Sequence, residues 1–265
     1  MSAAPFYYEP VDRAALRFAP TAATSSPWDD EAQHGGPPTA LLAHCIGVAH
    51  PRPDTIVARV STDFLGPIPK RVLEVHTRVL RAGKRVELSE ASLVDPRDGR
   101  IAVVLRAWRI RTAELALPVL PPADAVPPLP PEQPQRYLPG LTSWGYGEAT
   151  EWRFVTGGLD ALGRADVWTR VRVPLVAGVP LDPLARTLIV ADSTNGISVE
   201  LPIDSFLSIP PGLTVTLGRY PAGDWVFLGA RSLIFGGSGI AEARLGDPAG
   251  VFGAATQPLL IDPRA

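Results

Sequence analysis

The sequence has little of several residue types from which proteins build common sites. Its 265 residues include one cysteine, Cys45, which excludes an internal disulfide and a cysteine-based zinc site. The four histidines do not fall at a metal-ligand spacing such as H-E-x-x-H, which argues against a hydrolytic metal centre. Because the neighbours Leu42 and Ile46 are apolar, the Cys45 thiol is expected to be buried rather than to act as a nucleophile.

Aromatic residues, net charge and long apolar runs are scarce as well. Aromatic side chains make up 7% of the chain and the formal net charge is −2, which together argue against a nucleic-acid-binding surface. No stretch approaches the roughly 18 uninterrupted apolar residues of a membrane-spanning helix. The first ten residues lack the basic start and apolar run of a signal peptide. We therefore expect a cytoplasmic protein that binds neither nucleic acid nor membrane.

Proline, by contrast, is abundant, with 30 residues that are densest between positions 118 and 139. Proline lacks a backbone N–H and has a fixed φ, so this stretch favours neither a helix nor a central strand. We interpret residues 118–139 as a semi-rigid linker between an N-terminal domain, 1–117, and a C-terminal domain, 140–265. A ligand for a proline-binding domain is the alternative interpretation.

The same order of elements is predicted on both sides of this linker. Apolar residues at helical spacing predict one helix from Pro37 to Val48 and another from Asp182, a suitable cap, to Gly196. Alternating apolar and polar residues predict four strands after each helix. The predicted strands are 55–65, 72–80, 86–94 and 101–111 in the first half, and 213–217, 225–234, 239–245 and 252–261 in the second.

The two halves are related by a constant spacing. Identical residues pair between them: Leu65 with Leu217, Gly66 with Gly218, Pro69 with Pro221, Glu90 with Glu242, Leu93 with Leu245, Asp95 with Asp247, and Pro96 with Pro248. Every pair is 152 positions apart (217 − 65 = 152; 248 − 96 = 152). The shared Asp-Pro turn has a structural cause, which strengthens the case for internal duplication. We expect an α+β fold in which two antiparallel sheets each wrap one long helix and join into a continuous sheet.

Short motifs follow one another in a fixed order: His34-Gly35-Gly36 before the first helix, Ala191-Asp192 with Asn195-Gly196 in the second, Leu213–Leu217 through Asp224-Trp225, and Thr256-Gln257 near the end. In this order they resemble the acyl-CoA thioesterase II family, which has a duplicated hot-dog fold, and especially its divergent actinobacterial-type members. The resemblance covers nearly the whole chain. It implies a double hot-dog enzyme of fatty acid metabolism that hydrolyses acyl-CoA without a cofactor, either as a monomer or as a homodimer.

The resemblance also implies a catalytic site. In that family an Asp, a Ser or Thr, and a Gln hold the water that attacks the thioester carbonyl. By position, Asp192 is the general base or water anchor and Gln257 orients the water. The usual Thr position is occupied by Pro210, which has no hydroxyl. Thr214 is therefore the predicted third contact, with two alternatives, Ser208 and Thr216.

The duplication makes an independent statement about these residues. At the same offset, Asp192 corresponds to Ala40 and Gln257 to Leu105 (192 − 40 = 152; 257 − 105 = 152). A polar residue present in only one copy needs a local reason, and a carboxylate that takes a proton from water beside a carboxamide that orients it would supply one. Backbone N–H groups at a helix start are expected to polarise the thioester oxygen. His34 is expected to line a ligand channel, with Gly35 and Gly36, or to cap the helix start.

Two other functions of the same fold have to be weighed. The proline at position 210 is compatible with a non-catalytic protein that binds acyl-CoA or an acyl chain. A hydratase would require a carboxylate paired with a histidine, and no histidine lies near the second helix in the sequence.

A basic turn formed by Arg81, Lys84 and Arg85 is either a contact for coenzyme A phosphates or a solvated hairpin tip.

Overall fold

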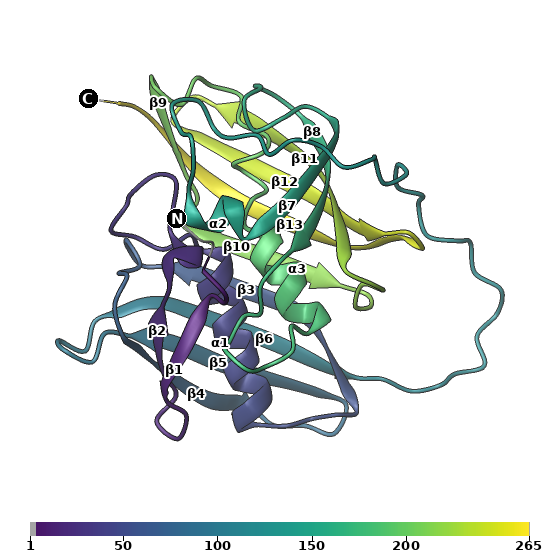
Figure 1. Ribbon diagram of the computed structural model, residues 1–265. Coiled ribbons are helices and arrows are strands. Elements are labelled where there is room, and N and C mark those ends of the chain that lie inside the picture. Colours follow the sequence, from purple (N-terminus) through teal and green to yellow (C-terminus); the bar gives the residue numbers. More distant parts are fainter. Residues whose placement is uncertain (1–3, 265) are drawn as a thin grey trace.

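The strands form one continuous antiparallel sheet in the computed structural model, which describes residues 4–264 (Figure 1). Its 13 strands run in the order β1-β2-β4-β5-β6-β3-β10-β13-β12-β11-β8-β7, and β9 pairs with β13. The first half contributes β1 (Tyr8–Asp12), β2 (Arg17–Pro20), β3 (Thr55–Phe64), β4 (Leu73–Arg81), β5 (Val86–Val94) and β6 (Ile101–Arg111). The second half contributes β7 (Thr150–Thr156), β8 (Ala165–Val171), β9 (Phe206–Ile209), β10 (Gly212–Leu217), β11 (Trp225–Phe235), β12 (Ser238–Asp247) and β13 (Gly250–Pro263).

The strand order of the second half mirrors that of the first. Outward from the central pair β3–β10, the order β6, β5, β4, β2, β1 is matched by β13, β12, β11, β8, β7. In the central pair, Ser61 lies opposite Thr214 and Thr62 opposite Leu213. Adding 152 to 61 gives 213, the partner of 62, and adding 152 to 62 gives 214, the partner of 61. The register of the junction is therefore the one that an internal duplication predicts.

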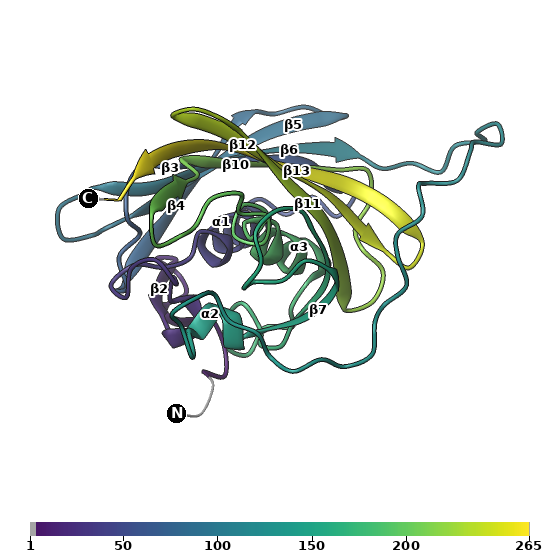
Figure 2. The same ribbon diagram turned by 90° about the horizontal axis from the view of Figure 1, so that it is seen from above.

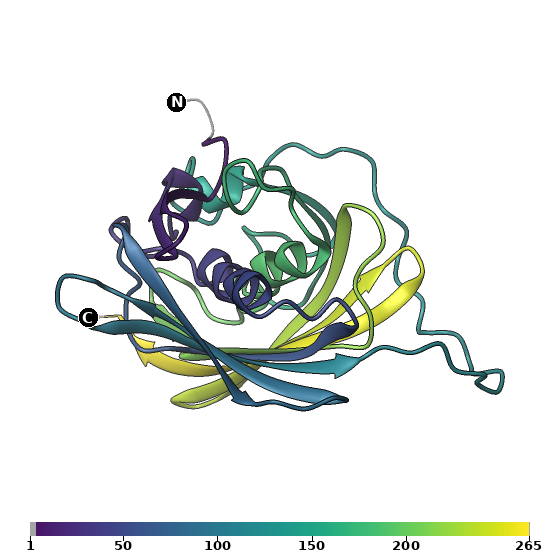
Figure 3. The same cartoon turned by 90° about the horizontal axis from the view of Figure 1, so that it is seen from below.

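Two helices lie side by side on the concave face of the sheet (Figures 2 and 3). Helix α1 (Gly36–Ala49) packs on β4, β5 and β6, and α3 (Pro183–Ala191) packs on β8 and β11. Because α1 is enclosed by the sheet and by α3, its apolar residues surround the helix instead of forming one stripe, and Leu41, Leu42 and Ile46 are at most 1% exposed. Cys45 is fully buried, as its apolar neighbours predicted.

Segments from both ends of the strand order cover the side of the helices that the sheet leaves open (Figure 2). The backbone N–H groups of Tyr7 and Tyr8 donate to Pro174 and Leu175 at 3.1 and 2.9 Å, and that of Ala177 donates to Tyr8 at 2.9 Å. A short 3-10 helix, η1 (Ala22–Thr24), packs against α2 (Gly145–Glu148) on this side. The first strand of the chain is thus bound to the second half.

No helix or strand forms between the end of β6 and the start of α2 in the described chain. Residues 113–122 are exposed and extend away from the body of the protein (Figure 1). The following residues lie against the second half: Asp124 accepts a backbone hydrogen bond from Val251 at 2.9 Å, and Pro127 accepts one from the Trp168 indole at 3.1 Å. The proline-rich stretch is therefore extended along its length but attached to the protein at its second part.

Helix α3 begins as predicted but ends five residues earlier (196 − 191 = 5). The Asp182 carboxylate accepts the N–H of Ala185 at 2.8 Å and so caps the helix start. Beyond Ala191, polar side chains bond to the local backbone instead of extending the helix: Thr194 Oγ1 donates to the Ala191 carbonyl at 2.7 Å. Residues 192–197 consequently form turns, whereas α1 continues for 14 residues.

The duplicated Asp-Pro turns serve the fold in both halves. Asp95 and Asp247 are fully buried, and each binds an arginine from the loop that precedes the adjoining hairpin. Arg71 donates to Asp95 at 2.8 Å and Arg219 to Asp247 at 2.7 Å. The repeated aspartates thus fix hairpin turns in both halves, each through a partly exposed arginine that lies outside the repeat spacing.

Candidate active site

Asp192 lies directly after α3, with its side chain 7% exposed, and donors from both halves surround it. Its Oδ1 accepts a hydrogen bond from Gln257 Nε2 at 3.0 Å, and its Oδ2 lies 3.1 Å from Nδ1 of His34. The backbone N–H of Gly36, at the start of α1, donates to Nδ1 of His34 at 3.3 Å, and the backbone N–H groups of Gly36 and Gly35 act on the carboxyl by lowering its pKa. Burial raises the pKa of Asp192 from 3.8 to about 7, although these donors partly oppose the effect.

Gln257 is fully buried on the inner face of β13, and both ends of its carboxamide are used within the protein. Nε2 donates to Oδ1 of Asp192 and, at 3.2 Å, to its backbone carbonyl, while Oε1 accepts the N–H of Asn195 at 2.9 Å. Gln257 does not reach the cavity described below. The geometry therefore lets Gln257 hold Asp192 in place rather than contact a water in that cavity.

His34 is the second ionisable group at this place. Its ring stacks on Tyr146 with 3.8 Å between centroids and 3° between planes. The Tyr146 hydroxyl in turn donates to the Ile189 carbonyl at 2.9 Å and lies 2.7 Å from Ser193 Oγ. Burial lowers the pKa of His34 to about 3, so its ring is neutral at physiological pH.

A histidine–carboxylate pair therefore does lie beside the second helix, contrary to the expectation from the sequence. The sequence hid it because His34 comes from the first half, 158 positions before Asp192 (192 − 34 = 158). Tyr146 was missed as well, and the repeat offers no signal for it because an offset of 152 leaves it without a counterpart.

The Gly35-Gly36 pair is required by space and not by an unusual backbone conformation. A Cβ at Gly35 would lie 2.6 Å from the Phe64 ring and 2.9 Å from Oδ2 of Asp192. At Gly36 a Cβ would lie 2.1 Å from the Ile189 carbonyl oxygen, inside α3. The two glycines let the start of α1 approach both α3 and the carboxylate.

The start of α1 has few N–H groups to offer a thioester oxygen. The Gly36 N–H donates to Nδ1 of His34 at 3.3 Å, and the next two residues, Pro37 and Pro38, have no N–H. The positive end of the α1 dipole instead favours the ionised form of a carboxylate supplied by the other half.

Thr214 does not lie beside Asp192. It lies half-buried in β10 between Leu213 and Val215, whose side chains are fully buried on the inner face, and it is not part of the cavity wall. Ser208 does line the cavity, but its hydroxyl donates to Oδ1 of Asn195 at 2.9 Å. Strand alternation places Thr214 and Thr216 on the face opposite to Leu213 and Val215, which the prediction of Thr214 as a site residue did not take into account.

A cavity of about 490 Å³ reaches Asp192 and His34 from the surface. It lies between the loop before α1, the turns after α3, and β9 with the segment that follows it. Its wall is mostly apolar and includes six aromatic residues: Trp28, Phe64, Trp144, Tyr146, Trp152 and Phe206. Arg264 lies on its rim, and an adjoining cavity of about 660 Å³ shares Trp28, Ile203 and Arg264 with it. These are the dimensions and composition of a small-molecule site.

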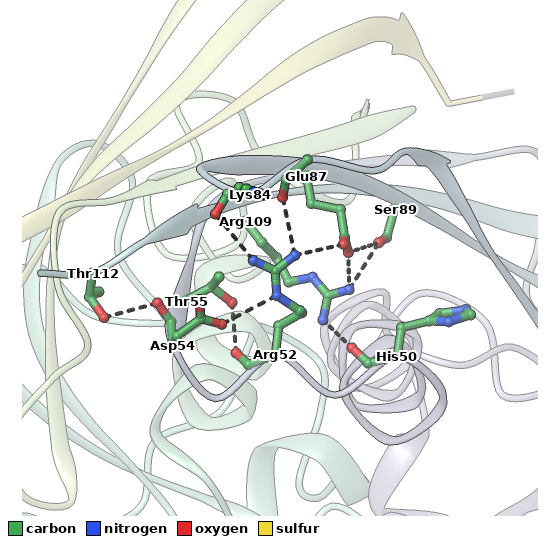
Figure 4. Close-up of polar contacts among 10 residues, drawn as sticks. His50, Arg52, Asp54, Thr55, Lys84, Glu87, Ser89, Arg109 and Thr112 are labelled. Carbon is green, nitrogen blue, oxygen red and sulfur yellow. Dashed lines mark hydrogen bonds and ion pairs between the residues drawn. The ribbon is translucent and has the colours of Figure 1, made fainter.

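A second buried polar cluster lies at the far end of α1 (Figure 4). Arg109 donates to the carbonyl of His50, which ends α1, and to the carboxylate of Glu87, which also binds Arg52 at 3.0 Å. This arrangement satisfies the negative end of the α1 dipole, so we assign it a structural role. The basic turn lies at this end as well, because Arg52 donates to the Lys84 carbonyl at 3.5 Å. A 14-residue helix is about 21 Å long, so this turn is remote from the cavity.

Within residues 4–264, no three or more His, Cys, Asp or Glu side chains are grouped to hold a metal ion. None of the helices in that range has the length and apolar character needed to cross a membrane.

Comparisons with known proteins agree with this architecture. Structures of similar overall fold include a protein of unknown function with a hot-dog fold from Alicyclobacillus acidocaldarius, at 14% identity and a TM-score of 0.73, covering 96% of each chain. An acyl-CoA thioesterase II, TesB2, from Mycobacterium marinum matches at 16% identity and a TM-score of 0.67, covering 97% of this chain and 96% of that one. The tesB protein of Mycobacterium avium subs paratuberculosis matches at 17% identity and a TM-score of 0.65, with the same coverage. At these identities the likeness shows the hot-dog fold.

No curated protein sequence matches the chain. Models of protein families do: residues 24–110 match the acyl-CoA thioesterase N-terminal domain, and residues 121–261 match the acyl-CoA thioesterase C-terminal domain. Together these matches cover most of the sequence, in the order in which the two halves occur. The chain therefore belongs to the acyl-CoA thioesterase family.

Proposed function

We propose that this protein hydrolyses acyl-CoA thioesters to a free acid and coenzyme A at the site around Asp192. The observation that carries the proposal is a buried carboxyl group, with a pKa of about 7, at the inner end of an apolar cavity. Such a group can change its protonation state at physiological pH, as acid–base catalysis requires. The proposal includes a double hot-dog architecture, with domains 1–117 and 140–265 joined by the linker 118–139.

In this proposal the reaction is attack of a water on the thioester carbonyl. Ionised Asp192 supplies the negative charge that favours proton removal from the water, and Gln257 fixes the position of Asp192. The carbonyl oxygen needs a hydrogen-bond donor that the protein does not already use. The backbone N–H of Gly196, which lines the cavity and has no acceptor within residues 4–264, is suitably free.

The two adjoining cavities offer a separate place for each part of the substrate, the acyl chain and coenzyme A. The aromatic and aliphatic wall of the inner cavity favours burial of the acyl group, which gains about 25 cal/mol for each Å² of apolar surface removed from water. Arg264 lines both this cavity and the adjoining one, and its guanidinium could bind a phosphate of coenzyme A. We place the acyl chain in the inner cavity and the coenzyme A arm along the adjoining one.

Thiol release from short to long acyl-CoAs tests this function. Wild type should release thiol, and Asp192→Asn should lower kcat by about 10²- to 10⁴-fold while acyl-CoA still binds. The wild-type rate should increase with pH through about 7, as Asp192 ionises. Asp124→Asn, which is exposed and lines neither cavity, is the matched control. Saturable binding without turnover at any chain length would instead indicate a non-catalytic acyl-CoA-binding protein.

A hydratase is the second candidate, and the His34–Asp192 pair favours it because a neutral imidazole beside a carboxylate can also add water across a double bond. A 2-enoyl-CoA substrate separates the two activities. Hydration removes the absorbance of the conjugated double bond without releasing thiol, whereas hydrolysis releases thiol. Loss of the absorbance alone would replace the thioesterase proposal.

A further inference from the structure

Strand β9 and the two prolines that follow it form one wall of the cavity that reaches Asp192. Every residue from Phe206 to Pro211 lines this cavity, and none of them lines the adjoining one. Within residues 4–264, β9 pairs only with β13, over four residues. Pro210 and Pro211 cannot extend this ladder because they have no backbone N–H. The position of the wall therefore depends on side-chain contacts as well as on the sheet.

Asn195 holds this wall through two reciprocal hydrogen bonds. Its Nδ2 donates to the Ser208 carbonyl at 2.9 Å, and Ser208 Oγ donates to its Oδ1 at 2.9 Å. Asn195 is 5% exposed, so these bonds satisfy a buried carboxamide that would otherwise lack partners. Both ends of the Asn195 side chain are thereby used on a single residue of β9.

The backbone of Asn195 makes a separate contact beside Asp192. Its N–H donates to Gln257 Oε1 at 2.9 Å, and a backbone N–H can only donate, so the other end of the Gln257 carboxamide, Nε2, faces Asp192. Because this contact uses the main chain, it remains when the Asn195 side chain is replaced. Asn195 thus connects the cavity wall with Asp192 through two contacts that mutation can separate.

We propose that the Asn195–Ser208 pair sets the selectivity of the cavity for the length of the acyl chain, by holding β9 in the position that contacts the chain. Both are positioning residues in this inference, which rests on the proposed thioester hydrolysis for its substrate. Apart from Ser208, the wall residues from Phe206 to Pro211 are apolar, so they contact the acyl chain and not the coenzyme A arm. A wall that is already ordered does not have to be ordered when the substrate binds, which favours binding. The pair therefore favours long acyl chains, which contact more of β9 than short ones do.

The test compares thiol release from acetyl-CoA and decanoyl-CoA by wild type, Asn195→Ala and Ser208→Ala. Each variant breaks the pair and keeps the main-chain contact with Gln257. We expect KM for decanoyl-CoA to increase about tenfold, the effect of one lost hydrogen bond. KM for acetyl-CoA should increase by less than about threefold, because its acyl group offers β9 only one methyl group.

The double variant Asn195→Ala/Ser208→Ala provides a second readout. Because both replacements break the same pair, the double variant should match the single variants instead of multiplying their effects. Ser205→Ala is the matched control, because Ser205 is exposed, precedes β9, lines neither cavity and bonds through its hydroxyl to Asp204 at 2.8 Å. Melting temperatures identify the folded variants, and Ser208→Ala, which removes only a hydroxyl, is the milder replacement if Asn195→Ala does not fold.

Three results would overturn the inference: an equal increase in KM for both acyl-CoAs, an unchanged KM for decanoyl-CoA in a folded variant, or independent effects in the double variant. Wild type that releases no thiol from any acyl-CoA would overturn the proposed function instead. The same comparison, made with the dissociation constants of the two acyl-CoAs, would then still decide whether the pair sets chain-length selectivity.

Discussion

At the residue scale, the buried position of Asp192 has a cost for the folded protein. Burial raises its pKa to about 7, whereas in the unfolded chain the pKa returns to its ordinary value of 3.8. Between these values the unfolded chain has lost the proton while the folded protein still holds it. The free energy of unfolding therefore decreases as pH rises from about 4 to about 7, and the loss persists above pH 7.

Asp192→Asn should consequently stabilise the protein at neutral and alkaline pH. The gain at pH 8 is at most about 4 kcal/mol, from roughly three pKa units at 1.36 kcal/mol each, and it should disappear below about pH 4. Urea unfolding of wild type, Asp192→Asn and the exposed-site control Asp124→Asn at pH 4 and pH 8 measures this. A gain of equal size at both pH values would contradict the linkage.

The sequence predicted individual site residues better than their contacts. The family resemblance named Asp192 and Gln257, and the repeat marked them independently because the other half has Ala40 and Leu105 at the same positions, both of which are fully buried. The same reasoning would also select Arg109, whose counterpart is Ile261 (109 + 152 = 261) and whose role is to end a helix. A polar residue in one copy therefore indicates a local requirement, which a structure must identify as chemical or architectural.

At the element scale, the close approach of α1 to α3 depends on the first residue of α1. The same helix contains a second glycine, Gly47, at which an added Cβ would meet nothing within 4 Å. Replacing each glycine by alanine therefore separates two effects: the contact between α1 and α3 at Gly36, and the intrinsic cost of a glycine within a helix at Gly47.

Gly36→Ala should destabilise the protein, because its Cβ would lie 2.1 Å from the Ile189 carbonyl oxygen. Overpacking of this kind costs about 1–3 kcal/mol, and activity should fall as well because Asp192 follows directly after α3. Gly47→Ala should stabilise by about 0.5–1 kcal/mol with unchanged kinetics. Thermal unfolding and thiol release on both variants measure the contrast, and equal effects at the two positions would refute it.

Strands with strict alternation were predicted almost to their ends, and β5 and β6 have the predicted bounds. The strands β1, β2, β7, β8 and β9 were missed because they are only 4–7 residues long and derive their register from neighbouring strands. The early end of α3 was missed because it depends partly on Gln257. The carboxamide of Gln257 accepts a hydrogen bond from the backbone N–H of Asn195, which lies 62 residues earlier in the chain. Contacts between distant segments are not encoded in local periodicity.

At the scale of the whole molecule, the halves are joined far more extensively in space than along the chain. The β3–β10 ladder, the α1–α3 contact and the backbone bonds of β1 to residues 174–177 all connect them. The covalent connection, in contrast, passes through residues 113–122, which are exposed throughout.

Cleavage in this exposed segment should therefore leave the protein assembled and active. A protease site inserted between Leu117 and Val119 would allow the chain to be cut after folding. The two fragments should co-elute in size-exclusion chromatography, and the cut protein should retain the kcat of the intact one. Separation of the fragments without denaturant would show that the linker, and not the interface, holds the halves together.

The position of His34 and Asp192 on different halves of the chain bears on how such a chain can evolve. In a symmetric assembly of two identical polypeptides, every mutation appears twice, so losing one site means losing both. Once the copies are fused, each position can mutate alone, as the alanine and leucine that stand opposite Asp192 and Gln257 illustrate. The first half is then free to acquire other properties at these positions, while it still supplies His34 to a cavity whose buried carboxylate is encoded in the other copy.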